Sequence, residues 1–61
     1  MRLPLKFAIL RTGHSQRSIA AAIGIPESRF SSIVHGWTQP RDGERAALAH
    51  ILGSSADELF S

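Results

Sequence analysis

One glycine between two short helical segments constrains the fold of this chain more than any other feature. Residues 15–36 contain both segments, with Ala20 four residues before Gly24 and Ile25 directly after it. A small residue lets two helices approach closely, a glycine accepts the backbone angle of a tight turn, and a buried aliphatic side chain holds that turn in place. The spacing therefore predicts two short helices that pack against each other around Gly24 and share a core that includes Phe30.

Helical spacing of apolar residues extends over the rest of the chain. Alanine and leucine recur at this spacing, and no stretch alternates long enough to be a strand. We therefore expect an all-α fold in a single domain over residues 1–61. The five expected helices span residues 4–12, 16–23, 26–35, 43–52 and 56–60.

Capping residues and apolar stripes indicate how these helices begin and pack. Ser15 and Asp42 are the expected N-caps of the second and fourth helices, and Ser55 with Glu58 forms a capping box for the fifth. The expected packing stripes, helix by helix, are Leu3, Phe7 and Leu10; Ile19, Ala20 and Ile23; Phe30 and Ile33; Ala46, Leu48, Ala49 and Leu52; and Leu59 and Phe60.

Composition argues against several other classes of function. The chain has 61 residues, which is one small domain, and it has no cysteine, so it contains no disulfide. Its net charge of +2 permits nucleic-acid binding. Its three histidines lack metal-ligand spacing, so we expect no metal and no cofactor. Without a signal peptide or an apolar run of about 18 residues, we expect a cytoplasmic protein with no membrane partner. Without a carboxylate–histidine pair or a glycine-rich phosphate loop, we expect neither an enzyme nor a small-molecule ligand.

The order of motifs along the chain is typical of one family of domains. The matching residues are Leu10-Arg11-Thr12-Gly13-His14-Ser15-Gln16, Ile19-Ala20, Gly24-Ile25, Gly36, Pro40, Ala49, Leu52, Gly53, Ser55, Asp57-Glu58 and Leu59. Over residues 7–60 the chain resembles a Cro/phage-repressor type helix-turn-helix domain, the XRE family. The resemblance implies a compact five-helix bundle of the lambda-repressor-like type that binds double-stranded DNA and regulates transcription. It also implies a homodimer on a palindromic operator, most often a repressor, with the helix at residues 26–35 in the major groove.

Candidate DNA contacts are polar residues of the second and third helices and of the loop before the fourth. Gln16 matches the family position that touches a phosphate, because a helix N-terminus attracts anions. In the third helix the serines suit phosphates or base edges, Glu27 suits cytosine, and Arg29 suits guanine. Arg17 and Arg41 are either phosphate contacts or idle surface charges. The candidate site residues are Gln16, Arg17, Glu27, Ser28, Arg29, Ser31, Ser32 and Arg41.

Other interpretations of the same residues stay open. The fold also suits a protein-interaction module, an antitoxin-type partner or a helical adaptor, and the polar face of the third helix suits plain solvation. Trp37 is expected in the core or in a subunit interface, with a sugar–phosphate contact as a third possibility. The expected dimer surface includes Ile51, Leu59 and Phe60. Salt separates the classes, because phosphate-driven binding weakens steeply as salt rises.

Overall fold

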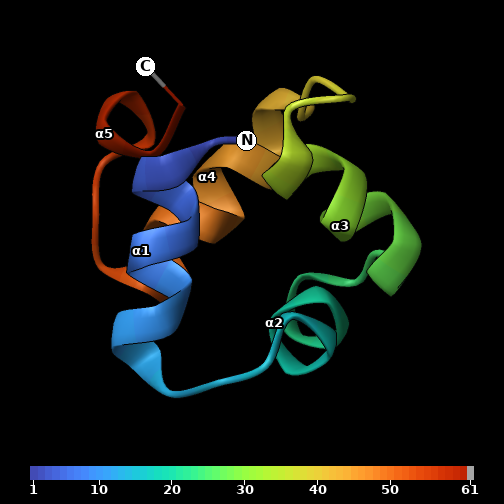
Figure 1. Ribbon diagram of the computed structural model, residues 1–61, viewed down its shortest axis with the longest axis horizontal. Helices are drawn as coiled ribbons and strands as arrows, with labels where there is room; N and C mark the ends of the chain where they lie inside the picture. The colour runs from blue at the N-terminus through green and yellow to red at the C-terminus, as the bar shows by residue number, and fades with distance from the viewer. Residues whose placement is uncertain (61) are drawn as a thin grey trace.

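Five helices make up most of residues 1–60, which are the residues that this computed structural model describes (Figure 1). They are α1 (Leu3–Thr12), α2 (Gln16–Ile23), α3 (Glu27–His35), α4 (Asp42–Leu52) and α5 (Ala56–Phe60). Within residues 1–60 there is no strand, so the all-α expectation is confirmed. Every helix ends at the residue predicted from the sequence, and no helix begins more than one residue away from its predicted start.

The N-caps are partly as predicted. The Ser15 hydroxyl accepts the N–H of Ser18 at 3.0 Å, which confirms it as the cap of α2. The prediction for α4 is wrong, because its N-cap is Arg41 and Asp42 is already helical. The reason is the Glu44 carboxylate, which accepts the Arg41 N–H at 2.7 Å and fixes the turn one residue earlier.

The fifth and third helices begin differently. Ser55 accepts the Glu58 N–H at 3.2 Å, so one half of the predicted capping box is confirmed. In the other half, the Glu58 carboxylate accepts from the Ser55 hydroxyl at 3.3 Å and not from its backbone N–H. Pro26 lies just outside α3 as an extended N-cap without a side-chain hydrogen bond, where the sequence placed it inside the helix.

Every helix contributes to one apolar core. The buried apolar residues are Leu5, Ala8, Ile9, Ile19, Ala20, Phe30, Ile33, Val34, Leu48, Leu52 and Leu59. Ile23, Ile25, Ala49 and Phe60 pack against this core while partly exposed. The predicted stripes of α2 and α3 are therefore confirmed. In α4 the prediction for Ala46 is wrong, because Ala46 is exposed.

The packing face of α1 is the opposite of the one expected. Leu3, Phe7 and Leu10 are 51%, 57% and 64% exposed, whereas the buried stripe contains Leu5, with Ala8 and Ile9. At about 100° per residue the two stripes point in nearly opposite directions, so α1 is apolar on both sides. Periodicity alone cannot choose between two apolar stripes. The choice is made by α3, α4 and α5, which pack against the buried one.

The two segments around Gly24 do pack against each other. Gly24 has a φ of 79°, and the Ile25 N–H donates to the Ala20 carbonyl at 3.0 Å, which closes the turn between α2 and α3. Figure 1 shows α1 and α3 on opposite sides of the view, with α4 between them and α2 below. None of the helices in residues 1–60 has the length and apolar character to cross a membrane.

Arg2 ties the start of the chain to the end of α3. Its backbone N–H donates to the Val34 carbonyl at 2.8 Å, and its Nε donates to the Ile33 carbonyl at 2.9 Å. A further bond of 3.2 Å joins its Nη2 to the Gln39 side chain. The last carbonyls of a helix lack partners within the helix and carry partial negative charge, so a guanidinium there is stabilising.

Candidate functional site

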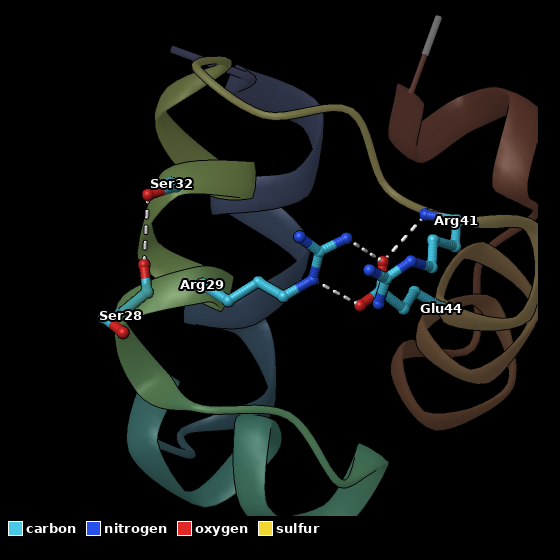
Figure 2. Close-up of polar contacts among 5 residues, drawn as sticks. All are labelled: Ser28, Arg29, Ser32, Arg41 and Glu44. Carbon is cyan, nitrogen blue, oxygen red and sulfur yellow. Dashed lines mark hydrogen bonds and ion pairs between the residues drawn. The ribbon is translucent and has the colours of Figure 1, made fainter.

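The outward face of α3 carries three hydroxyls and an imidazole. Ser28, Ser31, Ser32 and His35 fall within about 100° of one another on the helix, opposite the buried Phe30. Ser28 is exposed and the other three are partly buried. The Ser32 hydroxyl donates to the Ser28 carbonyl at 3.1 Å (Figure 2). The structure thus brings three of the predicted site residues together.

Arg29, in contrast, is turned away from these serines toward α4 (Figure 2). Its Nε and Nη2 donate to the two Glu44 carboxylate oxygens at 2.7 and 2.8 Å. The Arg29 side chain is 25% exposed and that of Glu44 only 9%. A bidentate pair of this kind fixes both side chains in position, so Arg29 holds α4 against α3.

Glu44 is the charged residue that sequence reasoning missed. It accepts from Arg29 and from the Arg41 N–H, and this lowers its pKa from 4.5 to about 2 against the opposing effect of burial. The hydrogen bonds from Arg29 contribute most to the shift. Its place three residues after the N-cap signals a capping role. No pattern of neighbouring residues in the sequence predicts its pairing with Arg29, which lies fifteen residues earlier.

The remaining predicted site residues lie at helix starts. Gln16 and Arg17 open α2, where Gln16 is half-buried and Arg17 exposed. Glu27 is the first residue of α3 and is exposed. Arg41 caps α4 with an exposed side chain beside Glu44 (Figure 2). No hydrogen bond or ion pair between described residues links these four side chains to the α3 serines.

Trp37 lies outside the core, so of its two favoured positions the core is wrong, whereas the subunit interface stays a prediction. It is 76% exposed and stacks on the His35 ring, with the ring centroids 4.5 Å apart and the planes 20° apart. The His35 Nδ1 lies 2.8 Å from the Ser31 carbonyl oxygen, which can only accept, so Nδ1 carries the proton. The outward face of α3 therefore continues into an exposed indole ring.

Leu59 is also unsuited to the dimer surface expected of it. It is 1% exposed and belongs to the core, and Phe60 lies beside the guanidinium groups of Arg2 and Arg45 at 5.7 and 5.6 Å. Of the three expected interface residues, Ile51 is the one that the structure leaves substantially open, at 40% exposure. It lines a hollow of about 260 Å³ between α2 and α4.

The hollow beside Ile51 is small. Its lining includes His14, Ser18 and Ile51, and its volume is below the range of about 300–1,000 Å³ typical of small-molecule sites. No group of three metal-ligating side chains gathers anywhere in residues 1–60.

Comparisons with protein-family models, with curated proteins and with solved structures found no match to this chain.

Proposed function

We propose that this protein is a sequence-specific regulator of transcription that binds double-stranded DNA, as its resemblance to the XRE family implies. The observation that carries the proposal is the outward face of α3, where Ser28, Ser31 and Ser32 lie together opposite the core. In this proposal the fold is of the lambda-repressor-like type, and α2 with α3 forms the helix-turn-helix.

Short hydroxyl side chains suit a helix that enters the major groove. The groove is about 12 Å wide, close to the diameter of about 10–12 Å of a helix with its side chains. Serine adds little to that diameter and offers both a donor and acceptors to base edges or phosphates. Serine is a mediocre helix former, so three serines on one exposed face are poorly explained by helix stability alone.

Exposed positive charge at the starts of α2 and α4 supports an anionic partner. From Ser28 to Arg41 the chain contains no acidic residue. Arg17 at the start of α2 and Arg41 at the start of α4 are exposed and suit phosphate oxygens, and Gln16 adds a polar contact at the α2 N-terminus. Glu27 is the exception, and its carboxylate is suited to the amino group of a cytosine.

Base recognition in this proposal falls on the serines and Glu27, with Arg29 in a supporting role. The Arg29 guanidinium is held by Glu44 through two hydrogen bonds. Contact with a guanine would break that pair and leave the largely buried Glu44 carboxylate unpaired, which is costly. Arg29 therefore positions α3 against α4.

A homodimer is part of the proposal. One short helix offers few base contacts, and selectivity within a genome needs more. Two copies would bind half-sites about one helical turn apart on a roughly palindromic operator, and occupancy of a promoter would repress transcription.

Selection of bound duplexes from a random DNA pool tests the proposal. We expect one enriched, palindromic sequence and an affinity that falls linearly with salt on logarithmic axes. Ser28→Glu puts a carboxylate on the outward face of α3 and should abolish binding. Ala46→Glu adds the same charge at an exposed site on α4 and should retain most of the affinity. An unenriched pool, or equal loss in both variants, would contradict the proposal.

A protein-interaction module is the second candidate function. It is favoured by the stripe of Leu3, Phe7 and Leu10 on α1, which is exposed and apolar. A partner helix packed on this stripe would bind through apolar contact, so binding would hold or tighten at high salt. Loss of partner binding in Phe7→Ser, with DNA binding absent in the wild type, would favour this function.

A further inference from the structure

We infer that Trp37, braced by His35, is a backbone contact whose free indole face packs against a deoxyribose beside the groove that α3 occupies. The inference rests on the proposed function and adds a binding residue to it. Trp37 is the most exposed of the large apolar side chains in residues 1–60, at 76%. Exposure of such an apolar ring to water is unfavourable in free energy, and a ligand that covers the ring removes this penalty.

The backbone of Trp37 is fixed before any ligand binds. Its N–H donates to the Ser32 carbonyl at 2.9 Å, and the Gly36 N–H donates to the Ile33 carbonyl at 3.1 Å. Gly36 itself has a φ of 83°, a left-handed conformation that favours glycine. This is a Schellman ending, which sets the direction in which the chain leaves α3.

The side chain of Trp37 is fixed as well. One face of the indole lies on the His35 ring at a centroid distance of 4.5 Å, and the His35 ring is anchored to the Ser31 carbonyl at 2.8 Å. Stacking restricts the rotation of the ring, so less entropy is lost when a ligand binds than for an unsupported side chain. A rigid, exposed aromatic ring is typical of residues that dominate an interface.

DNA is the partner that fits the surroundings of this ring. Trp37 directly continues the face of Ser31, Ser32 and His35, and it lies within a segment of the chain that has no acidic residue between Glu27 and Asp42. The apolar ring suits the sugar, and the indole N–H suits a neighbouring phosphate oxygen. Because sugar and phosphate are the same in every sequence, this contact adds affinity without sequence preference.

The intrinsic fluorescence of Trp37 can be used to test the contact directly, since it is the one tryptophan in the chain. Addition of the selected duplex to the wild-type protein should change the intensity and wavelength of its fluorescence at the same concentrations that saturate binding. Trp37→Ala should weaken the affinity about tenfold for the selected duplex and for unrelated duplexes alike. Trp37→Phe, which keeps a ring, should lose less.

Two further variants distinguish a DNA contact made by Trp37 from a general effect of losing an exposed apolar side chain, and test how far His35 positions the indole. Leu10→Ala removes an apolar side chain of similar exposure from α1 and should leave the affinity unchanged. His35→Ala removes the support beneath the indole, so the fluorescence anisotropy of Trp37 in the free protein should fall and the affinity should drop by less than in Trp37→Ala. Circular dichroism confirms in each case that the helices remain.

The outcomes distinguish this inference from the proposed function. Duplex binding with ordinary salt dependence, combined with unchanged Trp37 fluorescence and full affinity in Trp37→Ala, overturns the inference and leaves the proposed function standing. Tighter binding of the single strand than of the duplex also overturns it, because the ring would then stack on unpaired bases. If no DNA binds at all, the inference fails together with the proposed function.

Discussion

Replacing Glu44 with glutamine should destabilise the domain and remove a defined part of its sensitivity to acid. Glutamine has nearly the same shape but no charge, so the bidentate pair with Arg29 is lost while the space stays filled. A pKa lowered from 4.5 to about 2 corresponds to about 3 kcal/mol of stability if the whole shift acts on folding. Because the Arg29 side chain is 25% exposed and screened by water, we expect about 1–2 kcal/mol at pH 7.

The pH dependence follows from the direction of the shift. A carboxylate whose pKa is lowered by folding contributes its full stability above its unfolded pKa, here 4.5, and loses it as the pH falls toward about 2. Wild-type protein should therefore lose this contribution between those two values. Glu44→Gln lacks it from the start, so the free energies of unfolding of the two proteins should converge as the pH falls.

Urea unfolding followed by circular dichroism at several pH values measures the effect. Glu58→Gln is the matched control, since Glu58 occupies the same helix position in α5 as Glu44 does in α4. Glu58 is exposed and forms no ion pair within the described part of the chain. A constant difference between wild type and Glu44→Gln from pH 7 to pH 2 would refute the electrostatic explanation.

Two other predictions test the capping and the core. Ser15→Ala should lower the free energy of unfolding by about 1 kcal/mol, because the Ser18 N–H loses its acceptor, and urea unfolding would show it. Phe30→Ala should cost about 3–5 kcal/mol and unfold much of the protein, whereas Phe7→Ala should stay within about 0.5 kcal/mol. Phe30 is 0% exposed and Phe7 57%, and equal thermal midpoints in these two variants would contradict the orientation of α1.

Helix boundaries could be predicted because their signals are local. α1, α2, α3 and α4 each end at a glycine with positive φ, and α2 begins at a serine that caps it. Such signals need only a few neighbouring residues. The face that α2 and α3 bury also follows from spacing, because each of them has one apolar stripe and one polar side.

The remaining features depend on residues far apart in the sequence. α1 has two apolar stripes, and only its neighbours determine which one is buried. Glu44 and Arg29 come from different helices, so no local motif in the sequence predicts that they pair. Trp37 has a large apolar side chain of the kind expected in a core, yet the Schellman ending of α3 directs it outward. Contacts with DNA are still predictions from the sequence and the α3 surface.

The bond between Arg2 and α3 gives the chain a natural reporter of local opening. Residues near a chain end usually exchange their amide hydrogens with solvent rapidly, because ends fray. The amide of Arg2 is bonded to Val34, and the guanidinium of the same residue holds Ile33. Its hydrogen can exchange only when the start of the chain separates from the last turn of α3, so the exchange rate of the Arg2 amide measures how often these two segments separate.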